Sequence, residues 1–410
     1  MTDPHSYIMS STNTPNILLL TRRFSPPYTG GVPNYYKNLL QHLNRVKAVV
    51  ITSVINNARH QLVQPLKQGI HIHLVERVTF FPEYMGLQLK IGWWFDLGRM
   101  LTKLIHFIKN DHIDIIIVGQ VQMFLLLAAF FASRITGIPY VLFLHGEEIP
   151  QIPMKSNRIL RWLYRKASGY LCNSNFTRQR LRKFIGLKDI EAFVVHPGVE
   201  ERFFTTPSNL KELEERTGLK NKKIIYTIAR LDERKGQDMV IRSLPAIIRD
   251  CPEVVYLIGG QGPKLGYLKE LVSSMKLESH VRFLGLVPEE ELVAYHYLGD
   301  IFVMPNRILP DGDTEGFGIV FLEANAAGNP VIGGKEGGSV DAIVDRTTGF
   351  LVDPLDTEDI SERILSLLKD ENMRMKMGAA GKKRAWKEFR WPQLSEKFER
   401  NLLAILKLGE

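Results

Sequence analysis

Short apolar runs alternate with longer segments of helical periodicity along most of the chain. The runs are rich in Ile, Val and Leu and lie at residues 17–21, 49–52, 70–75, 113–118, 140–144, 170–173 and 193–196, and again at 224–228, 254–259, 281–284, 301–304, 330–333 and 350–352. Near-continuous apolar strands that are separated by helices are typical of parallel sheets covered on both faces. The pattern therefore predicts an α/β protein with two successive doubly wound, Rossmann-like domains.

The two predicted domains divide near residue 200. The segment from His196 to Glu200 ends a strand with a Pro-Gly pair, and a charged stretch and a new series of strands follow it. We predict a disordered polar tail over residues 1–15, a first domain over 16–200 and a second over 201–385. A final helical stretch over 373–408 has no strand after it, so we expect its last part, 386–410, to pack back on the first domain.

Residues 115–132 are apolar enough to be mistaken for a membrane span. A polar break at Gly119, Gln120 and Gln122 instead favours a buried strand, a turn and a covering helix. The opening residues have no apolar segment behind a basic start, so we expect no secretory signal.

The amino-acid composition excludes several classes of protein. The chain has 410 residues, of which 45% are apolar and 24% charged, so it is too apolar for a disordered protein and too long for one ordinary core. Its two cysteines, Cys172 and Cys251, exclude a disulfide framework and a cysteine-ligated zinc site, and they fit a cytoplasmic protein. The net charge of +9 favours phosphates, anionic lipids or other acidic partners.

Candidate binding residues follow the strands, where ligands of open parallel sheets gather. Gly30 and Gly31 lie between the first strand and a helix expected near Pro33. Paired glycines allow close approach of the backbone, and free amides at a helix start attract anions. An ordinary glycine turn with proline at the first helical position explains the same residues.

Two cations follow the first strand of the second predicted domain. Arg230 and Lys235 lie in a strand-to-helix loop, where a guanidinium fork and an ammonium group can neutralise a diphosphate. A merely charged, solvated loop is the alternative.

Two carboxylates, Glu315 and Glu323, are separated by seven residues. A helix that begins near Gly318 places Glu323 inside it and Glu315 before its amino end. The amides from Phe317 to Val320 then suit phosphate oxygens, and the carboxylates suit sugar hydroxyls, which donate hydrogen bonds to them. The apolar neighbours of Glu323 favour a specific partner over a surface position.

In this order, these motifs resemble those of the retaining GT-B glycosyltransferases of family 4. The resemblance rests on the Gly30-Gly31 loop, the Arg230 to Lys235 spacing, the E-x7-E pair and the His-Pro-Gly-Val hinge, and it covers residues 16–392. The second half is most similar to GDP-mannose-dependent phosphatidylinositol-mannoside mannosyltransferases. The resemblance implies a GT-B fold, in which two Rossmann-like doubly wound domains face each other across a cleft.

The resemblance also implies a site, residue by residue. Catalytic roles fall on His145, Arg230, Lys235 and Glu315, and His145 matches the family histidine that contacts the donor sugar. Taken alone, His145 is better explained as a satisfied histidine at the end of a strand. The residues implied in donor binding are Gly30, Gly31, Arg230, Lys235, Leu286, Val287, Glu315, Gly316, Phe317, Gly318, Ile319, Val320 and Glu323.

Within this set, the glycines and the two cations hold the donor diphosphate, Glu323 binds the ribose, Glu315 the hexose, and the loop at Leu286 and Val287 the base. Cleavage of a glycosyl-phosphate bond builds negative charge on the leaving diphosphate, so cations and amides carry catalysis. Similar enzymes are described as front-face retaining, with no hydrolase-style carboxylate pair. We expect no metal and no cofactor beyond the nucleotide-sugar co-substrate.

A basic stretch in the first half, which is predicted to bind the acceptor, suggests a surface for an anionic membrane. Residues 151–188 hold ten Lys or Arg and no Asp or Glu. Basic residues recur at helical intervals beside an apolar stripe; they are Lys155, Arg158, Arg161 and Arg165, and the stripe is Ile159, Leu160, Leu163, Tyr164 and Ala167. One interpretation is that the basic stretch 155–188 binds an anionic membrane, such as the inner face of the plasma membrane. The alternative is that the helix packs its apolar stripe on its own sheet. Aromatic residues at 80–85 and 93–95 fit an acceptor groove, an interfacial anchor or the core.

The sequence thus predicts a retaining hexosyltransferase that moves mannose from GDP-mannose to a hydroxyl of a lipid-linked or saccharide acceptor. Three alternatives stay open: a transferase that uses UDP-glucose, UDP-galactose or UDP-GlcNAc, a nucleotide-sugar epimerase on the same fold, and a basic binding protein without catalysis. We expect no nucleic-acid partner, because the basic residues follow a helix stripe without a known nucleic-acid motif. The oligomeric state is not predicted.

Overall fold

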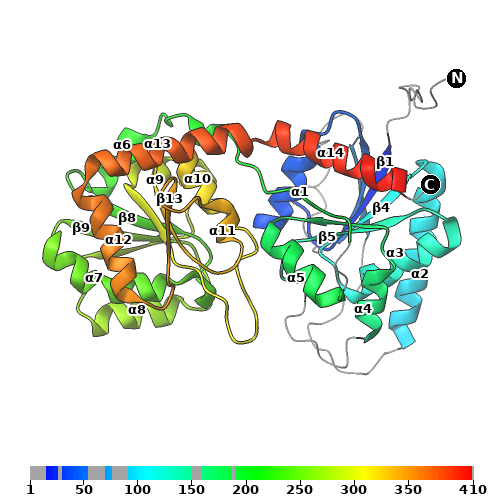
Figure 1. Cartoon of the computed structure of the whole chain (residues 1–410), viewed down its shortest axis with the longest axis horizontal. Helices are drawn as coiled ribbons and strands as arrows, with labels where there is room; N and C mark the ends of the chain where they lie inside the picture. Colours follow the sequence, from blue (N-terminus) through cyan, green and yellow to red (C-terminus); the bar gives the residue numbers. More distant parts are fainter. Residues whose placement is uncertain are drawn as a thin grey trace, which may run out of the picture.

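The computed structural model describes residues 15–25, 30–53, 70–75, 91–149, 158–186 and 190–408. These residues form two α/β halves that lie side by side (Figure 1). Lys155 and the aromatic residues at 80–85 lie outside the described residues, as does nearly all of the predicted tail.

The first half is built on a seven-stranded parallel sheet with the order β3-β2-β1-β4-β5-β6-β7. Its strands are β1 (Asn16–Thr21), β2 (Lys47–Ser53), β3 (Ile70–Val75), β4 (Ile115–Gly119), β5 (Tyr140–Leu144), β6 (Gly169–Cys172) and β7 (Ala192–Val194). Its helices are α1 (Gly31–Gln41), α2 (Ile91–Asn110), α3 (Met123–Thr136), α4 (Arg158–Arg165) and α5 (Asn175–Ile185).

The second half is built on a six-stranded parallel sheet with the order β10-β9-β8-β11-β12-β13. Its strands are β8 (Lys223–Ile228), β9 (Val254–Gly259), β10 (Val281–Gly285), β11 (Ile301–Met304), β12 (Val331–Gly334) and β13 (Gly349–Val352). Its helices are η3 (Glu201–Phe204), α6 (Leu210–Thr217), η4 (Glu233–Lys235), α7 (Gln237–Asp250), α8 (Leu265–Ser274), α9 (Glu289–Leu298), α10 (Ile319–Ala327), α11 (Ser339–Ala342), α12 (Thr357–Lys369) and α13 (Glu371–Glu388). A last helix, α14 (Trp391–Leu408), follows.

Each predicted apolar run corresponds to a strand, and both strand orders reverse direction at the first strand of their sheet, as in doubly wound folds. The predicted domain limits at residues 200 and 385 stay a prediction.

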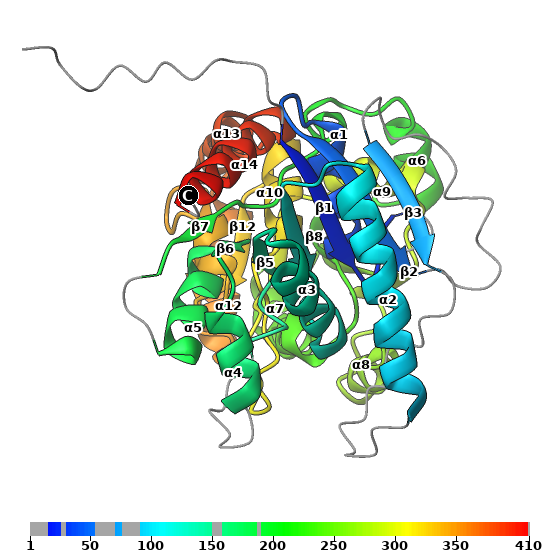
Figure 2. The same ribbon diagram turned by 90° about the vertical axis from the view of Figure 1, so that its right-hand side faces the viewer.

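Both faces of the first sheet are covered, which explains why its strands are apolar throughout. Successive side chains of a strand point to opposite faces. In β1, Ile17 and Leu19 pack with α1 and α14, whereas Leu18 and Leu20 pack with α2 to α5. Figure 2, which looks onto the first half, shows α2, α3, α4 and α5 as neighbours in that order.

The C-terminal helices join the two halves. The expected helical stretch over 373–408 consists of two helices, the end of α13 and the whole of α14. Between them Phe389 is buried, and its carbonyl oxygen accepts a hydrogen bond from the N–H of Val199 at 2.7 Å. Beyond this break α14 crosses to the first sheet, where Glu399 accepts the backbone N–H of Asn44 at 2.6 Å (Figure 1).

The apolar segment at 115–132 forms β4 and most of α3, as predicted. Among the described residues, no helix combines the length and the apolar character needed to cross a membrane.

Candidate functional site

The loops at the carboxyl ends of the two sheets touch at His145 and Gly316. A Cβ atom on Gly316 would overlap the carbonyl oxygen of His145, so this close approach requires glycine. The same carbonyl accepts a hydrogen bond from Asn173 Nδ2 at 3.0 Å. Ser174 Oγ, the next residue along, donates to the carbonyl oxygen of Gly316 at 2.7 Å. The predicted sugar-binding loops of the two halves therefore meet backbone to backbone.

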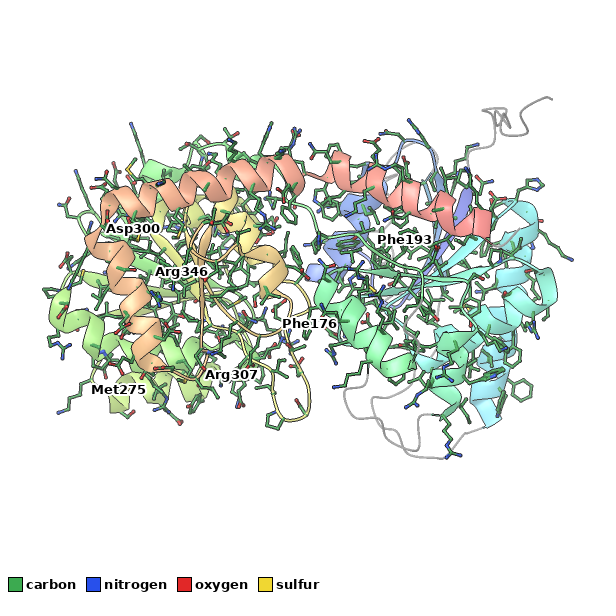
Figure 3. All side chains as sticks on the ribbon, in the orientation of Figure 1. Phe176, Phe193, Met275, Asp300, Arg307 and Arg346 are labelled. Carbon is green, nitrogen blue, oxygen red and sulfur yellow. The ribbon has the colours of Figure 1, made fainter. Side chains whose placement is uncertain are left out.

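A second contact joins the halves at the amino end of α5. Asp341 of the second half accepts hydrogen bonds from Asn175 Nδ2 at 2.9 Å and from the N–H of Phe176 at 3.2 Å. A carboxylate is stabilised there by the free amides and by the helix dipole. Figure 3 shows Phe176 on the side of the first half that faces the second.

Lys235 and Glu315, both predicted site residues, form an ion pair at the carboxyl end of the second sheet. They lie 80 residues apart in the sequence, and their side chains are only 10% and 13% exposed. Burial alone raises the pKa of Glu315, but Lys235 and Arg234 outweigh burial and hold that pKa below its usual range. The structure thus places an ionised carboxylate against the ammonium group in the region predicted to bind the donor.

Arg230, the other predicted diphosphate ligand, differs from Lys235 in being accessible. Its side chain is 69% exposed, and its Nε lies 3.3 Å from Asp232. An exposed guanidinium on a flexible side chain can turn toward an anion without first leaving a buried pair.

Two further arginine–carboxylate pairs frame this loop, and the sequence interpretation missed them. Arg234 donates to both carboxylate oxygens of Asp313, at 3.1 and 2.8 Å. Arg307 donates to both oxygens of Asp238, at 2.9 and 3.1 Å. Arg234 and Asp238 lie within a few residues of Lys235, Asp238 at the start of α7, but their partners come from a distant segment that no spacing indicates.

Glu323, the predicted ribose ligand, lies half-buried on α10. Burial, and then the charge of Glu200, raise the pKa of Glu323 to about 7, while Arg202 acts in the opposite sense. Arg202 in turn pairs with Glu200 at 3.1 Å and with Glu289. The predicted ribose ligand therefore belongs to a group of carboxylates that share one guanidinium.

His145, the predicted contact of the donor sugar, directs its ring into the first half. The ring is buried, stacks on Phe143 with centroids 5.0 Å apart, and places Nε2 2.6 Å from the hydroxyl of Tyr36. Burial lowers the pKa of His145 to about 3, so the imidazole is neutral. Its backbone, rather than its ring, contacts the second half. The catalytic role of His145 stays a prediction, and Tyr36 is a partner that the sequence interpretation missed.

The remaining predicted residues lie at helix starts and in a loop. Gly30 precedes α1 with φ 125° and Gly31 begins it, and a Cβ on either would meet open space. Gly318 precedes α10 with φ 88°, so the helix begins where we expected it. Phe317 is buried just before α10, and Ile319 and Val320 are the first residues of that helix. In the loop after β10, Leu286 is exposed and Val287 lies beside Gly259. The donor-binding roles of these residues stay a prediction.

The predicted apolar stripe of the basic helix packs mainly inward. Four of its members lie in or against the core of the first half: Leu160, Leu163, Tyr164 and Ala167. Only Ile159 is exposed, at 68%, next to Trp162 at 47%. The interpretation of the whole stripe as a membrane-facing surface is therefore wrong, and the alternative of packing on its own sheet is confirmed for the four inner residues.

No group of three or more His, Cys, Asp or Glu side chains with the geometry to hold a metal ion occurs among the described residues.

Comparison with known proteins places the chain in a family. A family model described as Glycosyltransferase Family 4 matches residues 29–203, and one described as Glycosyl transferases group 1 matches residues 210–384. The chain is 30% identical, over 92% of its own length and 95% of the relative's, to the GDP-mannose-dependent alpha-(1-6)-phosphatidylinositol monomannoside mannosyltransferase of Mycolicibacterium smegmatis. The chain belongs to glycosyltransferase family 4.

A second relative agrees with this assignment, and a solved structure has the same fold. The glycosyltransferase is 27% identical, over 93% of its length and 96% of the relative's, to a GDP-mannose-dependent monoacylated alpha-(1-6)-phosphatidylinositol monomannoside mannosyltransferase of Corynebacterium glutamicum. Its fold is similar to that of HepE from Anabaena in complex with UDP and glucose, with a TM-score of 0.76, 21% identity, and coverage of 95% and 99% of the two chains. The glycosyltransferase has the predicted GT-B fold and is a hexosyltransferase.

Proposed function

We propose that this glycosyltransferase moves mannose from GDP-mannose to a hydroxyl of a lipid-linked or saccharide acceptor, with retention of the anomeric configuration. The observation that carries the proposal is similarity over 92% of the chain to a mannosyltransferase that is named as GDP-mannose-dependent. The geometry is compatible with it, because Lys235, Glu315 and Arg230 lie near the contact between the halves.

Within this proposal, the donor diphosphate lies against Arg230, Lys235 and the amides that begin α10. Arg230, which is exposed, turns toward the diphosphate, while Lys235 stays paired with Glu315 and adds a fixed positive charge beside the leaving diphosphate. Glu315 also accepts hydrogen bonds from hydroxyls of the bound hexose. The leaving diphosphate takes the proton of the acceptor hydroxyl, which attacks from the same face and so retains the configuration. The positive charges of the site make a metal ion and any further cofactor unnecessary.

We further propose that the enzyme meets its acceptor at an anionic membrane, through the outer surface of α3 and α4 rather than through the inner stripe of α4. Exposed apolar side chains gather on these neighbouring helices; they are Phe131, Ile135, Ile159 and Trp162. Arg134, Arg158 and Lys166 are exposed beside them, and Lys166 lies over the ring of Trp162. Aromatic and basic side chains together suit the headgroup region of a membrane.

A donor screen tests the proposal. The purified protein is mixed with GDP, UDP or ADP, and the shift of its unfolding midpoint is measured. Transfer is then measured with GDP-mannose, UDP-glucose, UDP-galactose and UDP-GlcNAc against a bacterial lipid extract, and the anomeric configuration of the product is read by NMR. We expect stabilisation by GDP, transfer from GDP-mannose and a retained configuration. Stabilisation by UDP together with transfer from a UDP-sugar would show that the donor is a UDP-sugar rather than GDP-mannose. A product with inverted configuration would refute the proposed retaining mechanism.

The membrane part has its own test. We expect the protein to sediment with vesicles of phosphatidylglycerol and phosphatidylcholine but not with phosphatidylcholine alone, and Ile159→Ser with Trp162→Ser to abolish this. Equal sedimentation with both vesicles, or an unaffected double variant, contradicts the proposed surface.

A further inference from the structure

The imidazole ring of His145 lies in an aromatic pocket of the first half. Phe143 stacks on this ring, and Tyr35 and Tyr36 meet it edge-on, with centroids 5.3 and 5.2 Å away. The two tyrosines are neighbours on α1, the helix that begins at Gly31. The helix that follows the predicted diphosphate loop therefore packs against the predicted contact of the donor sugar.

The two tyrosines use their hydroxyl groups differently. Tyr36 directs its hydroxyl to Nε2 of His145, 2.6 Å away. Tyr35 donates its hydroxyl hydrogen to the carbonyl oxygen of Val195 at 3.1 Å. Both side chains are buried. Both tyrosine rings thus contact the imidazole, but their hydroxyl groups bind different atoms.

The turn after β4 fixes the position of the Tyr36 hydroxyl. A Cβ atom on Gly119 would overlap the phenolic oxygen, so this approach requires glycine. The next residue, Gln120, has a left-handed backbone with φ 53°, which is uncommon for a residue other than glycine. Its side-chain oxygen accepts hydrogen bonds from Thr21 Oγ1 at 3.1 Å and from the N–H of Arg23 at 2.9 Å. Such a strained backbone persists where its surroundings hold it, and here it lies against the phenol.

The protonation states indicate which atom donates in the contact between Tyr36 and His145. Burial lowers the pKa of His145 to about 3, so the ring is neutral and one of its nitrogens carries no hydrogen. Burial, and then the charge of Glu148, raise the pKa of Tyr36 well above its usual value, so the phenol keeps its hydrogen.

The backbone of Gln120 determines the direction of this hydrogen bond. It acts on the pKa of Tyr36 in the opposite sense to burial, as an N–H group that donates to the phenolic oxygen does. In the part of the chain that the structure describes, the acceptor within reach of the phenolic hydrogen is then Nε2 of His145. A hydrogen on Nε2 would leave the buried phenolic hydrogen without an acceptor, which is unfavourable.

We propose that Tyr36 is a positioning residue for glycosyl transfer, which donates to Nε2 of His145 and so holds the imidazole as the tautomer with its hydrogen on Nδ1. The inference rests on the proposed function, in which His145 contacts the donor sugar. In this tautomer Nδ1 is a hydrogen-bond donor, which suits an oxygen atom of a sugar. Because Tyr36 lies on the helix that begins at Gly31, one rigid element fixes both the diphosphate loop and the histidine ring.

NMR spectroscopy of wild-type protein with isotope-labelled histidine tests the tautomer. The signals of His145 are assigned by their loss in the spectrum of His145→Ala. We expect a neutral ring near neutral pH, with the hydrogen on Nδ1 and none on Nε2. Tyr36→Phe should lose this preference. A hydrogen on Nε2 in wild-type protein, or a mixture of the two tautomers, would overturn the proposal without reference to any variant of Tyr36.

A double-mutant cycle tests the role in catalysis. Transfer from GDP-mannose is measured for wild-type protein, Tyr36→Phe, His145→Ala and the double variant. We expect Tyr36→Phe to lower kcat roughly tenfold, because the histidine is then misplaced, and to leave the affinity for GDP unchanged. In the His145→Ala background the same change should have no further effect. A merely structural role of Tyr36 would lower activity by the same factor in both backgrounds.

Tyr35→Phe is the matched control, because the neighbouring tyrosine packs on the same ring but binds Val195. This variant should keep the tautomer and the kcat of wild-type protein. Equal losses of kcat in Tyr35→Phe and Tyr36→Phe would overturn the proposal.

The outcomes separate this inference from the proposed function. Absence of transfer from GDP-mannose by wild-type protein refutes the proposed function, and NMR spectroscopy then still decides whether Tyr36 sets the tautomer. Transfer from GDP-mannose with an additive cycle refutes the positioning role of Tyr36 alone. Full activity of His145→Ala refutes the contact of His145 with the sugar and the positioning role together.

Discussion

Replacing Lys235 with methionine removes one partner of a nearly buried ion pair and keeps the length of the side chain. The two side chains of the pair are 10% and 13% exposed, so Glu315 would lose its partner without gaining access to water. Removal of one partner from a buried pair costs about 3–5 kcal/mol of unfolding free energy. Arg234 still faces Glu315 in the variant, so we expect a loss near the lower end, about 3 kcal/mol.

The loss should depend on pH in a defined direction. Because the folded-state pKa of Glu315 lies below its usual range, this group stabilises the fold above its unfolded pKa, and the stabilisation is lost as pH falls through the folded pKa. Lys235→Met removes the main cause that lowers this pKa. The difference between wild type and variant should therefore be large near neutral pH and shrink on acidification.

Urea denaturation followed by tryptophan fluorescence, at about pH 7.5 and about pH 3, measures this difference, because the lower pH lies below the unfolded pKa of a glutamate. The matched control is the double variant Lys235→Met with Glu315→Gln, which leaves no unpaired buried charge. It should recover most of the stability at neutral pH but not the affinity for GDP. An equal loss at both pH values, or a double variant no more stable than the single one, would refute the electrostatic reasoning.

Three further changes have expected outcomes. Gly316→Ala should push the loop away from His145 and reduce transfer at least tenfold with little change in secondary structure, whereas Gly266→Ala, where a Cβ meets open space, should be neutral in the same assay; equal activity of both variants would contradict this. Asp341→Asn should weaken the contact at the amino end of α5 and so enlarge the radius of gyration measured by X-ray scattering. An unchanged scattering curve would argue against a role of Asp341 in holding the two halves together. The folded pKa of Glu323, raised to about 7, implies stability that is present below its unfolded pKa and lost as pH rises through about 7. Glu323→Gln should therefore flatten the decline of the denaturation midpoint between about pH 5 and about pH 7.5, and an identical slope in wild type and variant would count against that pKa.

The parts of the fold that local pattern determines could be predicted from the sequence. Runs of Ile and Val separated by helical segments indicated the strands of both sheets, because a strand buried on both faces leaves no polar position. Helix α10 begins directly after Gly318, where we expected it, and its start is also a local feature, since glycine readily takes the φ of 88° found there.

Features that depend on contacts between distant segments could not be predicted. Lys235 and Glu315 were both expected near the donor, but nothing in the sequence indicates that they pair with each other across 80 residues. Glu147 and Glu148 are adjacent and identical, and only the fold turns Glu148 toward the His145 backbone and leaves Glu147 exposed. The break between α13 and α14 arises where Phe389 is buried, although the helical pattern continues on both sides.

In the proposed function, the cations between the two halves hold the diphosphate of the bound nucleotide. Titration calorimetry of GDP and of guanosine against wild-type protein and Arg230→Ala tests it most directly. We predict that GDP binds wild-type protein at least a hundredfold more tightly than guanosine, about 2.7 kcal/mol, and that Arg230→Ala loses much of this difference while guanosine binding is unchanged. Equal affinities of GDP and guanosine for wild-type protein would contradict the account.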